Sequence, residues 1–179
     1  MSENRKIFLV GYSGCGKTSL GRKVAKRLGL LFVDTDAVIE EREQASVSDI
    51  FRYEGEEYFR NIEREVVKEA ASEDITTVIS TGGGLPVWGD NAELLNELGT
   101  TVYIRRTAKQ IVGRLSPYGR AKRPRFAGLD DAELIEFIGR DMIVREPFYA
   151  KARFVLDGDM FSDDELVDRL VKIYNGNEQ

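Results

Sequence analysis

Short apolar runs alternate with longer amphipathic segments along most of the chain. The apolar runs are rich in Val, Ile and Leu, and turn or acidic residues follow most of them. Parallel strands joined by crossover helices produce this alternation, so the pattern predicts an α/β fold. The predicted strands are residues 7–10, 30–33, 76–80, 101–104 and 154–156.

The segments between these strands have a helical distribution of apolar residues and end at recognisable stop signals. Gly29 ends the first segment, and we expect Pro147 to interrupt the longest one near its end, since proline removes a backbone donor. Helices are predicted over residues 17–28, 36–44, 48–53, 56–71, 92–98, 107–115, 130–149 and 163–174.

Residues 116–128 depart from this pattern. They include two prolines, two glycines and four basic residues, and no apolar period runs through them. We interpret the segment as a mobile basic lid. A solvated surface loop is the more common meaning of a charge run considered alone, and it remains an alternative.

The composition is that of a globular protein. The 179 residues are 42% hydrophobic and 32% charged, which is enough apolar surface for one core. We therefore expect a single domain over residues 1–179. No segment has the pattern of a signal peptide or a membrane span, which predicts a cytoplasmic protein with no membrane partner.

Charge and missing residue types exclude several function classes. The net charge of -5 gives a field that repels nucleic acids and anionic membranes, so an anionic ligand needs a local basic cluster. One cysteine excludes an internal disulfide and a cysteine-rich zinc site. Without any histidine, a Ser-His-Asp triad is impossible, and oxygen ligands favour magnesium over zinc.

A nucleotide-binding motif occupies residues 11–18. The residues Gly-Tyr-Ser-Gly-Cys-Gly-Lys-Thr match G-x-x-x-x-G-K-[ST], directly after a predicted strand and before a predicted helix. Backbone N–H groups and the helix N-terminus can then face a polyphosphate. Lys17 can reach the β- and γ-phosphates of ATP, and the Thr18 hydroxyl can bind magnesium. A chance glycine-rich turn is the alternative, but the context favours a nucleotide site.

Four further residues of this region belong to the predicted nucleotide site. Cys15 lies near a helix N-terminus, which can activate a thiol. We interpret it as a small filler residue, because the loop needs a backbone N–H there rather than a nucleophile. The other three residues are Gly14, Gly16 and Ser19.

Asp34 and Asp36 follow the second predicted strand, at the carboxyl edge where α/β sites form. Their alternate positions let both face one crevice. Magnesium prefers carboxylate and water oxygens, and an accepting hydroxyl needs a nearby carboxylate for its proton. Helix capping by the second aspartate is the more common role of a lone Asp-x-Asp, but the P-loop nearby favours a functional role.

Three later features could form the acceptor side. Arg60 and Glu63 have helical i, i+3 spacing and can pair, although a surface ion pair of little energy is the alternative. Three glycines at residues 82–84 follow a predicted strand and would offer a ligand close backbone approach and free N–H donors. Arg145, near the end of a predicted helix, indicates nothing by itself.

Taken in order, these motifs resemble those of the shikimate kinase family. They are G-x-x-G-x-G-K-T, D-T-D, G-E-x-x-F-R-x-x-E, the triple glycine, R-P in the basic segment and R-x-P-x-Y. The resemblance runs from about Lys6 to about Tyr174. It implies a three-layer P-loop kinase fold, with a five-stranded parallel sheet of order 2-3-1-4-5 flanked by helices. It also implies a substrate-binding region at about 34–63 and a lid at about 116–128.

The resemblance implies roles for individual residues as well. Asp34 is similar to the magnesium-side aspartate, and Asp36 to the aspartate that binds the acceptor hydroxyls and is proposed as the base. Arg60, supported by Glu63, would bind the substrate carboxylate. The other implied contacts are Arg145, Gly82, Gly83 and Gly84 with the substrate, Arg123 with the phosphates, and Arg114 and residues 157–159 with the adenine.

The lid departs from the family pattern after Arg123-Pro124. Arg125-Phe126 stands where paired leucines are usual, and Arg120 could share the phosphate contact.

We hypothesise that the chain transfers the γ-phosphoryl group of ATP to the 3-hydroxyl of shikimate, with magnesium. The products would be ADP and shikimate 3-phosphate, in aromatic amino acid biosynthesis. Lys17, Asp36 and Arg123 would be catalytic, and we expect a monomer that binds no nucleic acid.

Two alternatives remain. One is another small-molecule kinase of the same fold, such as a gluconate kinase, although Arg60 and the triple glycine favour shikimate. The other is a nucleotide-binding module without turnover. The acidic charge disfavours a nucleic-acid-dependent ATPase.

Overall fold

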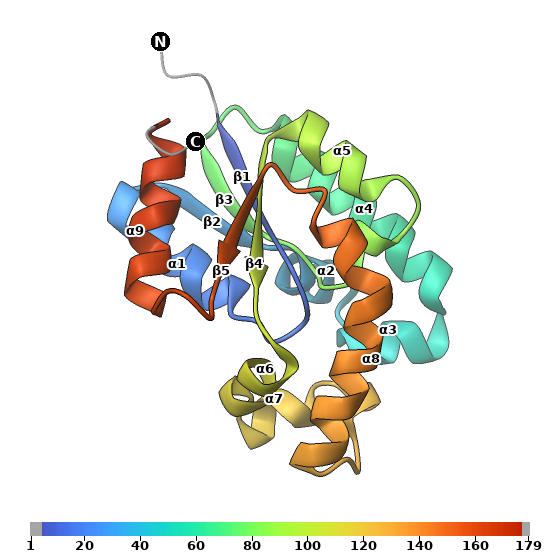
Figure 1. Cartoon of the computed structure of the whole chain (residues 1–179). Helices are drawn as coiled ribbons and strands as arrows, with labels where there is room; N and C mark the ends of the chain where they lie inside the picture. The colour runs from blue at the N-terminus through green and yellow to red at the C-terminus, as the bar shows by residue number, and fades with distance from the viewer. Residues whose placement is uncertain (1–4, 177–179) are drawn as a thin grey trace.

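A five-stranded parallel sheet forms the centre of the computed structural model, which describes residues 5–176 (Figure 1). The strand order is β2-β3-β1-β4-β5, which confirms the predicted α/β fold and the order 2-3-1-4-5. Each strand begins and ends within one residue of its predicted limits. The strands are β1 (Lys6–Val10), β2 (Leu31–Asp34), β3 (Thr77–Ser80), β4 (Thr100–Arg105) and β5 (Phe154–Asp157).

β1 is the central strand. All five of its residues are buried, and Phe8 is in register with Ile79 of β3 on one side and with Thr101 of β4 on the other. A strand that is buried on both faces needs a nearly continuous apolar run, which β1 has. The loop that follows β1 therefore begins at the middle of the carboxyl edge of the sheet.

Helices cover both faces of the sheet (Figure 1). Helices α1 and α9 lie on one face, whereas α4, α5 and the end of α8 lie on the other; α6 and α7 lie beyond the carboxyl ends of β4 and β5. The helices are α1 (Lys17–Leu28), α2 (Thr35–Glu43), α3 (Val47–Tyr53), α4 (Glu56–Ser72), α5 (Asn91–Leu98), α6 (Ala108–Arg114), α7 (Pro117–Ala121), α8 (Asp131–Tyr149) and α9 (Asp163–Tyr174). Two 3₁₀ turns are η1 (Leu85–Val87) and η2 (Pro124–Phe126).

The basic segment 116–128 contains more regular structure than its composition predicts. The Ser116 hydroxyl accepts a hydrogen bond from the Gly119 N–H at 3.0 Å and so caps α7, and η2 follows. Phe126 is buried and packs edge-on against Phe137 of α8. Both elements are too short to produce a visible period in the sequence, which explains why they were not predicted.

Pro147 does not interrupt α8, so that expectation is wrong. The helix continues through it to Tyr149. Because Pro147 lies in the last turn, its missing N–H removes a single hydrogen bond from the end of the helix.

Two apolar clusters stabilise the fold. The larger one surrounds the sheet, and the smaller one joins α2, α3 and α4 through Ile39, Ile50 and Phe59. The predicted substrate-binding region, residues 34–63, thus has a small core of its own. None of the helices between residues 5 and 176 has the length and apolar character that a membrane span requires.

The central strand should dominate stability. Leu9→Ala in β1, where the side chain is fully buried, should lower the free energy of unfolding by about 2–5 kcal/mol, because it leaves a cavity in a packed core. Ile143→Ala on α8, where the residue is 76% exposed, should change it by less than about 0.5 kcal/mol. Urea denaturation of both variants would measure these values, and equal losses would contradict the assignment of β1 as the core strand.

Candidate active site

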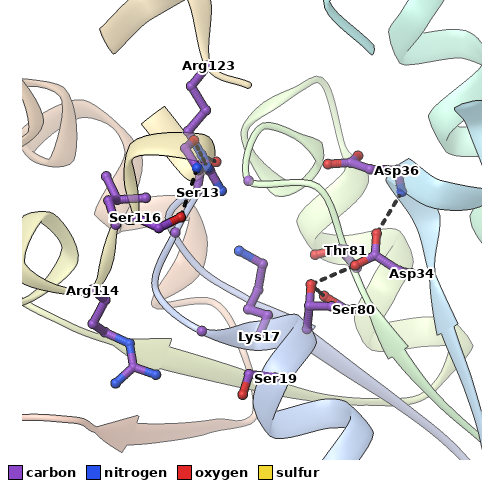
Figure 2. Close-up of a pocket in the computed structure, with 16 residues that line it drawn as sticks. Ser13, Lys17, Ser19, Asp34, Asp36, Ser80, Thr81, Arg114, Ser116 and Arg123 are labelled. Carbon is purple, nitrogen blue, oxygen red and sulfur yellow. Dashed lines mark hydrogen bonds between the residues drawn. The ribbon is translucent and has the colours of Figure 1, made fainter. Parts of the chain in front are cut away.

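A cavity of about 320 Å³ lies at the carboxyl edge of the sheet. Figure 2 shows Lys17 near its centre, with Arg123 and Ser13 on one side and Asp34 and Asp36 on the other. The predicted site residues that line it are Gly14, Gly16, Lys17, Thr18, Ser19, Asp34, Asp36, Gly83, Arg114 and Arg123. Cys15, Arg60, Gly82, Gly84 and Arg145 do not line it.

The P-loop wraps around the ammonium group of Lys17. Lys17 Nζ donates to the carbonyl oxygens of Gly11 at 2.7 Å and Tyr12 at 3.0 Å. Gly16 has a φ of 102°, a left-handed conformation that favours glycine, and it begins α1. Cys15 is fully buried, as a filler residue would be, but its N–H donates to the Tyr12 carbonyl, so the expected N–H for a ligand is used within the loop instead.

Asp34 connects the P-loop to the second strand. Its Oδ2 accepts from the Thr18 hydroxyl at 2.6 Å, and that hydroxyl also lies 3.2 Å from Ser80 Oγ. Its Oδ1 accepts from the N–H groups of Asp36 and Ala37, which caps α2. The first aspartate of the pair is therefore the cap, and the capping alternative that assigned this role to the second aspartate is wrong. Capping by Asp34 leaves the Asp36 side chain available to the cavity.

Asp36 is half-buried, and one oxygen of its carboxyl is fully buried and unbonded. Its Oδ1 has no hydrogen-bond partner among the described residues, and neither has Oε1 of the neighbouring Glu63. Burial, together with the negative charge of Asp34, raises the pKa of Asp36 to about 6, although Lys17 opposes the shift. Burial likewise raises the pKa of Glu63 to about 7, against the opposing charge of Arg60.

Arg60 lies in a buried setting on α4. Arg60 Nη1 donates to Glu63 Oε2 at 2.6 Å, which confirms the predicted pair and excludes the surface ion pair, since Glu63 is fully buried. The guanidinium carbon lies 5.5 Å from the centre of the Phe51 ring and 5.3 Å from that of Phe59. Arg60 Nε has no hydrogen-bond partner among residues 5–176. Arg60 thus keeps one unused donor, although it does not line the cavity in this structure.

The triple glycine provides space for the groups around it. A Cβ on Gly82 would overlap Glu63 Oε1 and lie 2.9 Å from Asp36 Oδ1. A Cβ on Gly83 would lie 2.8 Å from the Ser13 nitrogen, and one on Gly84 would lie 2.6 Å from Arg60 Cζ. The close approach predicted for this segment is thus to the protein's own groups.

Arg145 reaches the same region from α8. It pairs through Nε with Asp141 Oδ2 at 2.9 Å and lies 5.7 Å from the centre of the Tyr12 ring. It also interacts with the Tyr149 hydroxyl, which donates to the Gly83 carbonyl at 2.6 Å. Arg60 of α4 therefore lies directly against Gly84, whereas Arg145 of α8 reaches the triple glycine through Tyr149.

The lid contacts the P-loop through Arg123. Its Nε donates to the Ser13 hydroxyl at 2.8 Å, and its Nη1 donates to the Gly119 carbonyl. Arg120, the other candidate, pairs with Asp131 at the start of α8 and does not line the cavity. Arg123 is therefore the one of these two arginines that lines the cavity together with Lys17.

An acidic residue at the start of α9 organises the far end of the P-loop. Asp163 accepts from Arg114 at 2.8 Å and from the buried Arg106 at 2.6 Å. Arg106 Nε donates to the Cys15 carbonyl at 2.9 Å, and a Cβ on Gly158 would lie within 2.9 Å of its side chain. The P-loop thus contacts the segment 157–159, as well as the start of α9, through Arg106.

Sequence reasoning missed several residues of the cavity wall. Ser80 is the last residue of β3, so the rule that strand carboxyl ends form the site could have indicated it. Ser13 lies in a variable position of the P-loop motif and gives no such signal. The other missed lining residues are Thr81, Leu115, Ser116 and Gly119.

The donor set fits a magnesium ion. Thr18 and Asp34 offer a hydroxyl and a carboxylate at the cavity wall, which are ligands that magnesium prefers. Residues 5–176 contain no group of three or more His, Cys, Asp or Glu that could hold a metal by itself. An ion at this position would therefore share its ligands with phosphates and water, as is usual for magnesium.

Comparison with known proteins identifies close relatives. The family model described as shikimate kinase matches residues 13–175. A shikimate kinase of Parabacteroides distasonis is 42% identical over 92% of this chain and 94% of that protein. The crystal structure of shikimate kinase from Bacteroides thetaiotaomicron has a TM-score of 0.87 and 36% identity, and the match covers 96% of this chain and 98% of that one. Shikimate kinase from Acinetobacter baumannii in complex with shikimate has a TM-score of 0.84 and 28% identity, covering 97% and 94%.

The space provided by Gly82 can be tested directly. Gly82→Ala should lower the free energy of unfolding by about 1–3 kcal/mol, because its methyl group would displace the Glu63 and Asp36 carboxyls. Gly139→Ala is the matched control in α8, since nothing lies within 4 Å of its Cβ position, and it should be neutral or stabilise by up to about 1 kcal/mol. Chemical denaturation gives both values; a neutral Gly82→Ala would show that the two carboxyls are not held as described.

The buried Glu63 should make stability depend on pH. Its pKa rises on folding from 4.5 to about 7, so the folded state binds more protons within that window. The free energy of unfolding should therefore fall as pH rises toward 7, and Glu63→Gln should reduce this slope.

Glu65→Gln, an exposed change on the same helix, is the control for this measurement and should leave the slope as it is. Urea titrations at several pH values between 5 and 8 would provide the slopes. An identical slope for Glu63→Gln and the wild type would rule out a raised pKa for Glu63.

Proposed function

The chain belongs to the shikimate kinase family, and we propose from this that it transfers the γ-phosphoryl group of ATP to the 3-hydroxyl of shikimate. The products are ADP and shikimate 3-phosphate, an intermediate of aromatic amino acid biosynthesis. The observation that supports this most directly is the position of Asp36. Asp36 lines the same cavity as Lys17, and its Oδ1 has no hydrogen-bond partner among the described residues. An acceptor hydroxyl and the phosphoryl group would meet in this cavity.

The acceptor is oriented by its carboxylate. Arg60 lies against Gly84, and Arg145 interacts with Tyr149, whose hydroxyl donates to the Gly83 carbonyl. Two guanidinium groups can hold one carboxylate with fixed orientation, because each presents a planar fork of donors. A ring that carries both a carboxylate and hydroxyls would then place one hydroxyl near Asp36. This arrangement supports a carboxylated alcohol as the substrate.

The transfer step needs a proton acceptor and positive charge. The hydroxyl oxygen of the acceptor forms a bond to the γ-phosphorus, the bond to the β,γ-bridging oxygen of ATP breaks, and Asp36 takes the hydroxyl proton. Lys17 and Arg123 supply positive charge beside the transferred group. In a loose transition state such charge and correct positioning contribute more than a strong base does.

Thr18 and Asp34 are the residues that would hold magnesium. The ion, when bound, neutralises negative charge on the β- and γ-phosphates. Arg114 and the segment 157–159 would border the adenine, on the side of the P-loop that Asp163 and Arg106 organise. Gly14, Cys15, Gly16 and Ser19 complete the nucleotide side.

Three regions of one kinase domain have different roles. The P-loop (11–18) binds the phosphates, and residues 34–63 contribute to the acceptor side. The lid (116–128) covers the cavity, and its Arg123 donates a hydrogen bond to Ser13 of the P-loop. Exclusion of water by a closed lid would suppress hydrolysis of ATP. We further propose that the enzyme acts as a cytoplasmic monomer without nucleic-acid or membrane partners, in agreement with its acidic charge.

Turnover with a panel of acceptors tests the function. ADP release with ATP and magnesium should appear with shikimate and be absent with gluconate and with nucleoside monophosphates. Asp36→Asn should lower kcat by about 10²–10⁴-fold, because the proton acceptor is lost. Its binding of ATP should stay near the wild-type value.

Asp168→Asn is a suitable control for charge removal, since Asp168 pairs with Arg27 on the exposed outer face of α1 and α9. Its turnover should match the wild type. ADP release that does not depend on shikimate would contradict shikimate as the substrate. Normal turnover by Asp36→Asn would show that Asp36 is not the base.

A further inference from the structure

One carboxylate oxygen on α8 accepts from three different parts of the molecule. Asp141 Oδ2 accepts from the Tyr12 hydroxyl of the P-loop at 2.7 Å and from Arg125 of the lid at 3.1 Å. It also accepts from Arg145, one turn along α8, at 2.9 Å. P-loop, lid and acceptor arginine thus meet at a single atom.

The charges of this cluster do not balance. Within residues 5–176, Asp141 is the one carboxylate that pairs with either Arg125 or Arg145, so two guanidinium groups share one negative charge. Burial alone would raise the pKa of Asp141, but the hydrogen bonds from Tyr12 and Arg125, with the charge of Arg145, lower it below its usual range. Asp141 therefore stays ionised, and the cluster keeps an excess positive charge that favours an added anion.

The two arginines of the acceptor side are held in different ways. Arg60 pairs with Glu63 through Oε2, while Glu63 Oε1 has no partner. Arg145 pairs with an oxygen that the lid and the P-loop also use. The position of Arg145 should thus depend on where the lid and the P-loop lie, whereas that of Arg60 should depend mainly on α4.

We propose that Asp141 is a positioning residue that orients Arg145 toward the substrate carboxylate and joins it to the P-loop through Tyr12 and to the lid through Arg125. The proposal rests on the function proposed above, since it assigns the carboxylate of the acceptor to Arg145. It gives a role to Arg125, which belongs to the part of the lid that departs from the family pattern.

Asp141→Asn tests this, because it keeps the size of the side chain and removes its charge. The KM for shikimate should rise roughly 10-fold, the effect expected when a charged hydrogen-bond partner is lost, while the KM for ATP changes by less than about twofold. A purely structural role would lower thermal stability without this split between the two substrates.

Asp131→Asn is the matched control. Among the ion pairs of residues 5–176, Asp131 forms the second one between α8 and the lid, with Arg120, and it has no pair with Arg145 or hydrogen bond with Tyr12. Its shikimate KM should stay within about twofold of the wild type. If Asp131→Asn raises that KM as much as Asp141→Asn does, any pair between α8 and the lid suffices and the proposal is wrong.

A second measurement needs no substrate. In hydrogen exchange, Asp141→Asn should increase exchange in both 11–18 and 116–128, whereas Asp131→Asn should increase it in 116–128 alone. Unchanged exchange of 11–18 in Asp141→Asn would overturn the proposal even for a chain that does not phosphorylate shikimate. Failure of the proposed function appears separately, as absence of shikimate-dependent turnover in the wild type.

Tyr12→Phe provides a further variant if Asp141→Asn does not fold. It removes one hydroxyl and keeps the ring beside Arg145, so the shikimate KM should rise about threefold and exchange of 11–18 should increase. No change in either quantity would contradict the contribution of the P-loop to this cluster.

Discussion

The carboxyl ends of β1, β2 and β3 meet at one edge of the sheet, and the rest of the site depends on this. The P-loop follows β1, Asp34 and Asp36 follow or end β2, and the triple glycine follows β3. Because β1, β2 and β3 are parallel and neighbouring, these segments all begin at the same edge. Side chains from distant parts of the chain thereby come within hydrogen-bond distance, as Thr18 and Asp34 do.

Glycine makes this crowded edge possible. The three glycines after β3 contact the Asp36 and Glu63 carboxyls, the P-loop and Arg60, and a side chain at any of them would require these groups to move. Two buried carboxyls without complete hydrogen bonding are unfavourable for stability. They persist beside Arg60 and Lys17, where the same desolvation that raises their pKa also strengthens interactions with a bound ligand.

The acceptor side is assembled from elements with separate supports. α4 carries Arg60 and packs in a small core with α2 and α3, whereas α8 carries Arg145 and packs against the lid through Phe126 and Phe137. Arg60 and Arg145 are thus supported by different parts of the structure.

Local patterns in the sequence determined the strands and the P-loop, because apolar period and motif spacing act over short distances. The strand order and the identity of many cavity residues followed from the family resemblance. The pairing of Arg60 with Glu63 followed from helical spacing in the same way. Tertiary structure alone decided which aspartate caps α2, why each glycine is needed, and that Arg123 rather than Arg120 lines the cavity together with Lys17. It also decided the contacts of Asp141, since Tyr12, Arg125 and Arg145 are far apart in the chain and meet only when α8 packs beside the P-loop.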